Sequence, residues 1–320
     1  MKNIKTAYIL LCIAVGIMLN SCAYPVRSED NRISVVCTAF AQYDWVKHIV
    51  EGREDVFEII YLNDNGVDMH SFQPDASDIV SLCDSELVIS IGGYSESWID
   101  KAVENSGNKN IRQLKLIELL GEEVLFTDSC DEENEHDHEH ISVVDEHVWL
   151  SLKNAVFFCN AIAEVICELD PENEDYYESN VKSYTDKLCE LDRISADFIS
   201  TAPRDTIIVA DRFPLRYLVR DYSIKYCAAF DSCSSDSEAS FETLALLAEK
   251  IEQNRAKVIF VTETSDKRIA RALAEPYGDE IKIFELESMQ AVSSKEIEKG
   301  MSYLDVMQNN LALIHGALIV

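Results

Sequence analysis

The feature that most constrains the fold is an alternation of short β-branched runs with helical patterns, which occurs twice along the chain. In the first half we predict strands at 33–38, 57–62, 87–91 and 115–119, and helices at 45–50, 77–85 and 97–104. In the second half we predict strands at 206–210, 225–230, 258–262 and 281–284, and helices at 213–220, 241–253, 266–274 and 303–318. Such alternation is typical of βα units around a largely parallel sheet. The chain therefore predicts an α/β protein of two lobes.

The segment between the two halves predicts one long helix. Asp170 is suited to the N-cap and Pro171 to the first helical position, and no proline or glycine follows until Pro203. A helix of about 30 residues is roughly 45 Å long, which suits a rigid connection between lobes. A length of 320 residues also favours two lobes. We therefore place the first lobe at 33–169, the linking helix at 170–202 and the second lobe at 203–320.

Five of the seven histidines lie in three places along the first half of the chain. His70 follows a turn-like segment at 63–66, His147 lies in Asp-Glu-His-Val-Trp at 145–149, and three more lie in the acidic run 128–140. Neutral imidazole and carboxylate are the groups that hold zinc, and manganese takes more oxygen ligands. The pattern therefore predicts a transition-metal site.

His70 and His147 are the candidates for fixed ligands. His70 comes after a predicted strand, and the carboxyl ends of strands are where α/β sheets bind ligands. Asp68 could orient the ring of His70, and Asp145 or Glu146 the ring of His147. Taken singly, each histidine reads as a solvated loop residue, but their similar contexts indicate a pair.

The acidic run 128–140 contains His136, His138 and His140 and has no apolar residue from position 131 onward. It cannot contribute to a core, so we expect a mobile loop that collects metal weakly and passes it on. The alternative is a solvated acidic loop with histidines there by chance. The spacing is not His-Glu-x-x-His, which argues against a metalloprotease.

The formal charge of −30 restricts the partners of this protein. Nucleic-acid phosphates would be repelled, so we expect no nucleic-acid binding. Negative potential concentrates cations, although it also serves solubility alone.

The first 22 residues predict a targeting segment. Lys2 and Lys5 precede an apolar run at 7–19 that is too short for a transmembrane helix. Leu-Asn-Ser-Cys at 19–22 resembles a bacterial lipobox, so we expect Cys22 to be acylated and 23–32 to form a flexible tether. The alternative is an ordinary secretory signal cleaved nearby.

Ten cysteines would suggest disulfides in an exported protein. Four of the eight left in the mature chain, Cys83, Cys159, Cys167 and Cys189, lie on apolar helical faces and are expected to be core thiols. We consider one disulfide, between Cys227 and Cys233 across a short loop.

Several motifs together resemble the zinc/manganese solute-binding lipoproteins of bacterial ABC importers. They are the lipobox, Gly66-x-x-x-His70-x-x-x-Pro74-x-x-x-Asp78, Trp98, the acidic histidine loop, Asp145-x-His147-x-Trp149 and Tyr303-Leu-Asp-Val-Met-x-x-Asn310. The likeness covers nearly the whole mature chain. It implies two α/β lobes joined by a long helix, metal held in the cleft between them, and delivery to an ABC permease. It also implies a monomer tethered by lipid to the outer face of the bacterial membrane.

The same resemblance implies a ligand set, with His70 and His147 as the two ligands from the first lobe. The family's third ligand position is Ala210 here, which departs from the family pattern. Asp211 is one residue away and is the candidate to replace it, although Arg212 is an alternative partner for Asp211.

The fourth family ligand, usually an aspartate after the last strand, matches Glu287. Glu263 also ends a predicted strand on the cleft side and is a further candidate ligand. Alternatively, it caps a helix or acts as a base that does not touch the metal. Glu238 is a weaker substitute in a serine-rich loop.

The resemblance favours zinc as the metal, because the histidine-rich loop accompanies zinc transporters in this family, and manganese is the alternative. We therefore expect a non-enzymatic protein that captures zinc and delivers it to a permease. Two other classes remain as alternatives. One is a surface adhesin or metal sensor, and the other is a zinc hydrolase in which Glu263 or Glu287 activates a metal-bound water.

Overall fold

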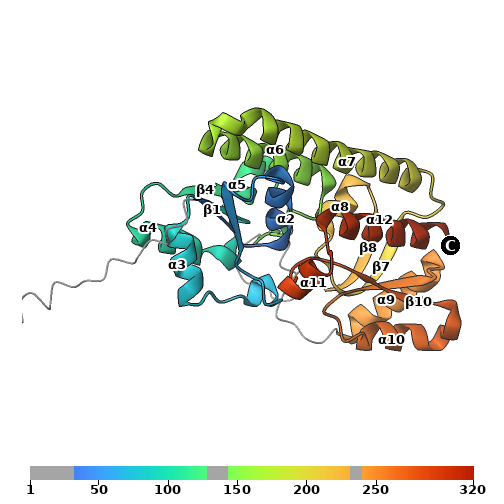
Figure 1. Ribbon diagram of the computed structural model, residues 1–320. Coiled ribbons are helices and arrows are strands. Elements are labelled where there is room, and N and C mark those ends of the chain that lie inside the picture. Colours follow the sequence, from blue (N-terminus) through green and yellow to red (C-terminus); the bar gives the residue numbers. More distant parts are fainter. Residues whose placement is uncertain (1–31, 128–142, 231–239) are drawn as a thin grey trace, which may run out of the picture. The chain divides into compact units, whose positions relative to one another are not determined.

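Two four-stranded parallel sheets organise the part of the chain that the computed structural model describes, residues 32–127, 143–230 and 240–320 (Figure 1). The first sheet has the order β2-β1-β3-β4 and consists of β1 (Ile33–Cys37), β2 (Phe57–Tyr61), β3 (Leu87–Ser90) and β4 (Arg112–Lys115). The second has the order β10-β9-β7-β8 and consists of β7 (Thr206–Arg212), β8 (Lys225–Phe230), β9 (Val258–Thr262) and β10 (Lys282–Leu286). The predicted two-lobe α/β fold is confirmed.

The burial of each strand follows from its place in its sheet. All residues of the inner strands β3 and β9 are buried, because helices cover both faces of a parallel sheet. The edge strands β4 and β10 are largely exposed. The helices outside the linking segment are α2 (Phe40–Ile49), α3 (Ala76–Asp84), α4 (Trp98–Ser106), α5 (Leu116–Leu120), α6 (Leu152–Leu169), α8 (Arg216–Asp221), α9 (Phe241–Asn254), α10 (Arg268–Ala274), α11 (Ser294–Glu298) and α12 (Tyr303–Ile319).

One predicted strand is wrong. We expected a strand at 115–119, but the strand β4 ends at Lys115 and the next residues form the short helix α5. Leu116 is fully buried, and Leu119 and Leu120 pack on the same core, which is the spacing of one helix face. A short apolar run does not separate these two outcomes, because both bury the same side chains.

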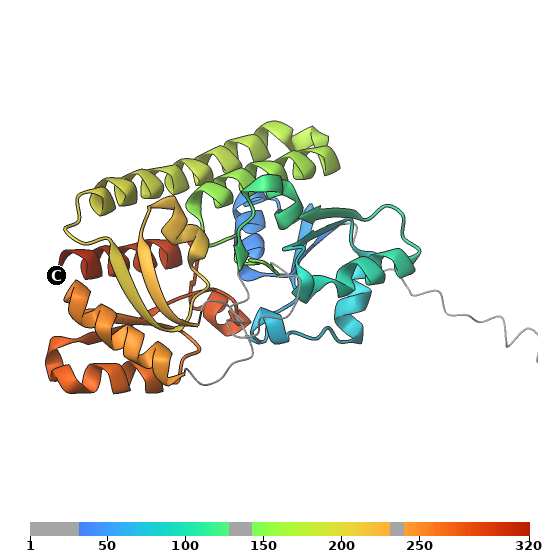
Figure 2. The same ribbon diagram turned by 180° about the vertical axis from the view of Figure 1, so that it is seen from behind.

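The linking helix α7 (Glu174–Ser200) has 27 residues and follows a short 3-10 turn at Pro171–Asn173. Its length is about 40 Å at 1.5 Å per residue. It packs against α2 and α6 of the first lobe and against α12 of the second, and Figures 1 and 2 show it running beside all three. Asp170 does not cap the backbone, because its carboxylate instead accepts hydrogen bonds from Tyr177 and Asn173.

A buried carboxylate ties α7 to both lobes. Oδ2 of Asp44, on α2, accepts a hydrogen bond from the hydroxyl of Tyr184 on α7 at 3.2 Å and another from the backbone N of Tyr303 at 3.2 Å. The second donor belongs to the first turn of α12. Burial raises the pKa of Asp44, although His48 and these two donors oppose the shift. The cost of burying the carboxylate is thus partly offset at the point where three helices meet.

A small antiparallel ladder joins β5 (Phe126–Thr127) to β6 (Val143–Val144), the strands on either side of the acidic run in the sequence. The predictions for Cys22, the tether, His136, His138 and His140, Cys233 and Glu238 lie outside the described residues. Within the described ranges, no helix has both the length and the hydrophobicity required to cross a membrane.

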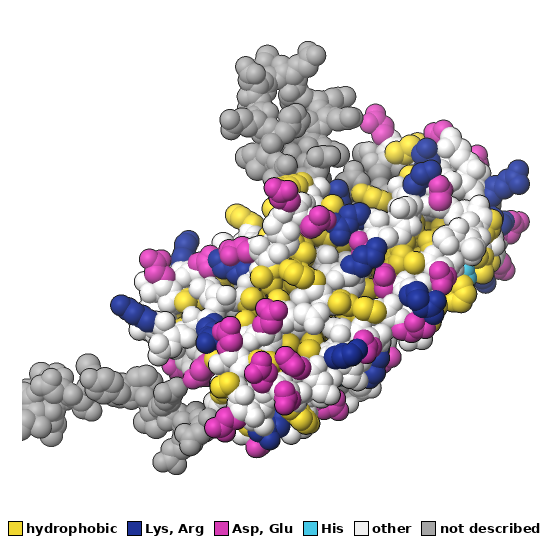
Figure 3. Space-filling model, turned by 90° about the horizontal axis from the view of Figure 1, so that it is seen from above, with side chains coloured by type: hydrophobic (Ala, Val, Ile, Leu, Met, Phe, Trp, Pro, Cys, Tyr) yellow, Lys and Arg dark blue, Asp and Glu magenta, His cyan; other side chains and the backbone are white. Residues whose placement is uncertain are grey.

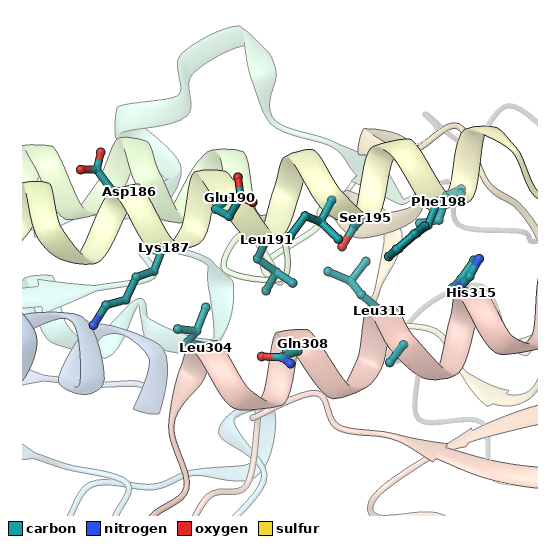
Figure 4. A pocket seen from close by; sticks show the side chains of 13 residues that line it. Asp186, Lys187, Glu190, Leu191, Ser195, Phe198, Leu304, Gln308, Leu311 and His315 are labelled. Atoms are coloured by element: carbon teal, nitrogen blue, oxygen red, sulfur yellow. The ribbon is translucent and has the colours of Figure 1, made fainter.

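A cavity of about 640 Å³ lies between α7 and α12. Leu191 and Leu311 point toward one another across it, and Phe198 stacks on His315 at one end (Figure 4).

On the face shown in Figure 3, acidic and basic side chains are interspersed rather than gathered by sign. The excess of acidic residues therefore does not form one continuous patch on that face.

The Asp44→Ala variant should lower the free energy of unfolding by about 1–3 kcal/mol, because it leaves buried donors of Tyr184 and Tyr303 unsatisfied. Urea denaturation measures the change. Asp186→Ala, an exposed substitution on α7, is the control and should stay within about 0.5 kcal/mol of wild type. Equal effects of the two substitutions would show that the Asp44 junction does not stabilise the fold.

Candidate metal centre

The fold brings the two candidate histidines into direct contact. His70 lies in the 3-10 turn Met69–Ser71, in the loop that follows β2, and His147 lies between β6 and α6. Their Nε2 atoms are 3.2 Å apart, although 77 residues separate them in sequence. The side chain of His70 is 24% exposed and that of His147 is 7% exposed. The pair is therefore nearly buried and remains accessible from the side of His70.

This separation fits two ligands of one ion. Nitrogen atoms bound at about 2.0–2.1 Å to a tetrahedral zinc lie about 3.3 Å from each other. Two Nε2 lone pairs directed at the same point repel one another unless a hydrogen on one ring or a metal ion lies between them. The separation therefore fits either a hydrogen bond between the two imidazoles or their shared binding of one metal ion.

Asp145 orients the ring of His147. Its Oδ1 lies 2.7 Å from Nδ1 of His147 and also accepts a hydrogen bond from the backbone N of that residue at 3.0 Å. The side chain of Asp145 is 1% exposed, and Nε of Arg216 lies 3.7 Å from its Oδ2. A carboxylate can only accept, so Nδ1 of His147 carries the hydrogen and Nε2 keeps its lone pair.

The ring of His70 is oriented by residues other than the one we expected. Asp68 accepts a hydrogen bond from the backbone N of His70, at 2.9 Å, and does not contact the ring. Nδ1 of the ring instead lies 2.9 Å from Oγ of Ser95 and 3.5 Å from Oε2 of Glu146. Burial opposes ionisation of Glu146, but hydrogen bonds from His70 and Ser95 outweigh it and lower the pKa of Glu146 to about 2. Glu146 therefore orients His70 and not its neighbour His147.

The three candidate carboxylates of the second lobe lie at the carboxyl ends of adjacent strands. Asp211 is near the end of β7, Glu263 follows β9 and Glu287 follows β10. Burial and then the charge of Glu263 raise the pKa of Glu287 to about 7. Burial also raises the pKa of Glu263, and the charge of Asp68 adds to the effect. Carboxylates from both lobes thus lie close enough to disfavour one another's charge.

The segment after β10 connects these carboxylates to the histidines. The carbonyl of Ser288 accepts a hydrogen bond from Nε1 of Trp149 at 2.9 Å, and the carbonyl of Gln290 accepts one from the backbone N of Met69 at 3.2 Å. Glu287 is therefore one residue from a contact with the His147 loop and three residues from a contact with the His70 turn.

Each second-lobe carboxylate is engaged locally in this structure. Oδ2 of Asp211 accepts hydrogen bonds from the backbone N and the hydroxyl of Thr262, at 3.1 and 2.8 Å. Glu263 accepts from the backbone N and the hydroxyl of Ser288, and Glu287 accepts from the backbone N of Met289. Within the described ranges, no three His, Cys, Asp or Glu side chains are grouped closely enough to hold a metal ion. The structure thus brings His70 and His147 together but not yet with Asp211, Glu263 or Glu287.

One contributor to the site, Ser95, was not found from the sequence. It lies in the loop after β3, and the rule that ligands bind at carboxyl ends of strands indicated that loop but not which residue. Ala210, which stands at the position where the resemblance implied a ligand, is buried in β7 and contributes to the core of the second lobe.

Two α/β lobes joined by a long helix, with a pair of imidazoles in contact, are the features of a two-lobed solute-binding protein. Comparison with known families agrees with this class. The chain belongs to the ZnuA family, described as component A of the periplasmic zinc-uptake complex, whose family model matches residues 35–317.

Individual relatives give the same result. The chain is 30% identical to the high-affinity zinc uptake system protein ZnuA of Bacillus subtilis over 92% of this chain and 90% of that protein. It is 26% identical to the zinc-binding lipoprotein AdcA of Streptococcus pneumoniae over 97% of this chain but only 60% of the longer AdcA. It is 24% identical to the manganese ABC transporter substrate-binding lipoprotein PsaA of Streptococcus mitis, with 97% of both chains covered. The crystal structure of the metal-dependent lipoprotein YcdH from Bacillus subtilis covers 90% of this chain with a TM-score of 0.74 at 27% identity, and all of YcdH is matched.

The buried carboxyl of Glu96, behind the site, should make stability depend on pH. Burial raises its pKa from the ordinary value of 4.5 to about 7, although Thr38 and the backbone N of Gly92 donate hydrogen bonds to it. The folded state therefore holds a proton that the unfolded state releases, so stability falls as pH rises from about 4.5 to about 7, by up to about 3 kcal/mol.

Glu96→Gln should remove this dependence, because the amide stays neutral at every pH. Urea unfolding of metal-free wild type and variant at pH 5 and pH 8 tests the prediction. Between pH 5 and pH 8 the variant should become more stable relative to wild type. A difference that is the same at both pH values would contradict it.

Proposed function

We propose that this protein captures zinc outside the cytoplasm and delivers it to the permease of an ABC importer. The observation that carries the proposal is the 3.2 Å approach of the Nε2 atoms of His70 and His147. Membership of a zinc-uptake family supports it. Capture, transfer and release need no covalent chemistry, so we propose no enzymatic step.

We propose that His70 and His147 bind the ion together with a carboxylate of the second lobe. Glu287 is the first choice, because it lies next to the segment that contacts both histidine loops. The mutual repulsion that raises the pKa values of Glu263 and Glu287 would be relieved by a cation beside them. Asp211 ranks third, because binding metal would require it to release Thr262.

Zinc is preferred over manganese as the cargo. The two residues that already converge are imidazoles, and nitrogen ligands suit zinc, whereas manganese favours oxygen. One relative named for zinc uptake and another named for zinc binding support this choice. Manganese remains the second candidate. The carboxylates Glu263 and Glu287 lie close together in the second lobe, and a relative matched over 97% of both chains is named for manganese.

The parts outside the described residues complete the proposal. We propose that Cys22 carries the lipid anchor, that 23–32 is the tether, and that His136, His138 and His140 collect metal for the cleft site. The names of lipoprotein relatives support an anchored protein. We retain 33–169, 170–202 and 203–320 as the boundaries of the first lobe, linking helix and second lobe, and the monomer as the functional unit.

His70→Ala and His147→Ala should each weaken zinc binding strongly, because each removes one of the two nitrogens that meet at the site. The loss of zinc affinity should be larger than the loss of about 10- to 100-fold that follows removal of a residue that only hydrogen-bonds to a ligand. Calorimetric titration of metal-stripped protein with zinc and with manganese measures it. His315→Ala is the control, because that histidine stacks on Phe198 in the groove between α7 and α12.

Zinc affinities of the two variants within a few-fold of wild type would contradict the site. Transport is then tested by growth under zinc limitation. Wild type should restore growth of a strain that lacks the gene, and the His70→Ala/His147→Ala double variant should not. A phenotype of surface attachment that the double variant retains would instead favour adhesion.

Deletion of residues 130–140 should leave one tight zinc site, because the proposed ligands all lie elsewhere in the chain. The deletion should lower only the number of weakly bound ions in the same titration. Loss of tight binding on deletion would show that the loop supplies a ligand of the main site.

A further inference from the structure

Glu146 is an acidic side chain beside the site that is not one of the candidate ligands. Glu146 is adjacent to His147, yet its carboxylate lies against the loop that follows β3 and the ring of His70. Oε1 accepts a hydrogen bond from the backbone N of Ser95 at 3.0 Å, and the side chain is 7% exposed. Its position is therefore fixed on the side of His70 that faces away from the ion.

We propose that Glu146 is a positioning residue that selects the metal-binding tautomer of His70 and supplies the second negative charge beside the imidazole pair. This inference rests on the proposed function, since it assigns a role relative to a zinc ion at Nε2 of His70. It concerns a residue that does not touch the ion.

Hydrogen-bond direction carries the first half of the argument. Oε2 of Glu146 is buried, lies 3.5 Å from Nδ1 of His70 and has no hydrogen-bond partner among the described residues, while Oγ of Ser95 lies 2.9 Å from the same nitrogen. A carboxylate can only accept, so its place beside Nδ1 favours the tautomer with the hydrogen on Nδ1, in which Nε2 keeps the lone pair that zinc requires. Without Glu146 only the Ser95 hydroxyl faces Nδ1, and a hydroxyl donates as readily as it accepts, which allows the tautomer that carries its hydrogen on Nε2.

Charge carries the second half. Asp145 lies behind His147 and Glu146 lies behind His70, so each neutral imidazole has one carboxylate at its far nitrogen. The two carboxylates offset part of the charge of a dication held by two neutral rings, since Arg216 already faces Asp145. The first lobe therefore supplies both nitrogens and part of the compensating charge, and the proposed second-lobe carboxylate adds to it, a set that suits zinc better than ions that need several direct oxygen ligands.

Gly93 shows that the surrounding chain is shaped around this carboxylate. The φ of Gly93 is −90°, which other residues adopt readily, so the backbone does not require glycine there. A Cβ at this position would lie 2.2 Å from Oε1 of Glu146 and 2.5 Å from its Cγ. Gly93→Ala is therefore a substitution that displaces Glu146 while leaving every candidate ligand and every charge in place.

The experiment compares Glu146→Gln, Glu146→Ala and Gly93→Ala with a control, Gly316→Ala, whose added Cβ meets no atom within 4 Å. Zinc affinity is measured by competition with a chelator. We expect it to fall about 10- to 100-fold in the three test variants and to stay unchanged in the control. Thermal unfolding of each protein identifies variants that do not fold, and Glu146→Gln, which has the same size as wild type, guards against that loss.

Two further readouts separate positioning from general damage. Imidazole nitrogen chemical shifts of metal-free protein should show a larger fraction of the tautomer with hydrogen on Nδ1 of His70 in wild type than in Glu146→Ala. The Gly93→Ala/Glu146→Ala double variant should bind zinc no more weakly than Glu146→Ala, because both changes act through one side chain.

The inference is overturned if Glu146→Gln and Glu146→Ala bind zinc within twofold of wild type. It is also overturned if the His70 tautomer is unchanged in Glu146→Ala, or if the two single effects add fully in the double variant. Failure of the proposed function gives a different result, since wild type itself would then not bind zinc at His70, whatever the tautomer in the metal-free protein.

Discussion

The arrangement of the site depends on the hydrogen bonds between the segment after β10 and the two histidine loops. Trp149 donates to the carbonyl of Ser288, and Met69 donates to the carbonyl of Gln290. Both acceptors are buried, so breaking either bond leaves polar groups unsatisfied in the interior. These contacts hold loops of both lobes together, and the rings of His70 and His147 meet beside them.

Most of the fold could be predicted from the sequence, because many of its strands are short β-branched runs, and β3 and β9 are buried on both faces. β9 consists of four apolar residues followed by Thr262, all of them buried, and the pattern predicted its bounds correctly. The long helix was predictable from thirty residues without proline or glycine. The segment after Lys115 was not, since the burial of Leu116, Leu119 and Leu120 satisfies a helix face, whereas local composition also suits a strand.

The site was predictable only in part, for a physical reason. His70 and His147 could be paired because each lies in a loop with acidic neighbours. Which acid serves which ring depends on side-chain direction, and the sequence does not specify that direction. Adjacent residues in the extended chain before Trp149 point to opposite sides, so Asp145 contacts the ring of His147 while Glu146 faces His70. The role of Ser95 arises only from the packing of the β3 loop against that chain.

Positions 93 and 146 occupy one shared volume. The side chain of Glu146 extends into the space that a β-carbon at position 93 would need, so neither residue can drift independently of the other. A descendant of this chain with a larger residue at 93 would have to move or shorten the side chain at 146. The surroundings of the His70 ring are therefore coupled to a glycine in a neighbouring loop.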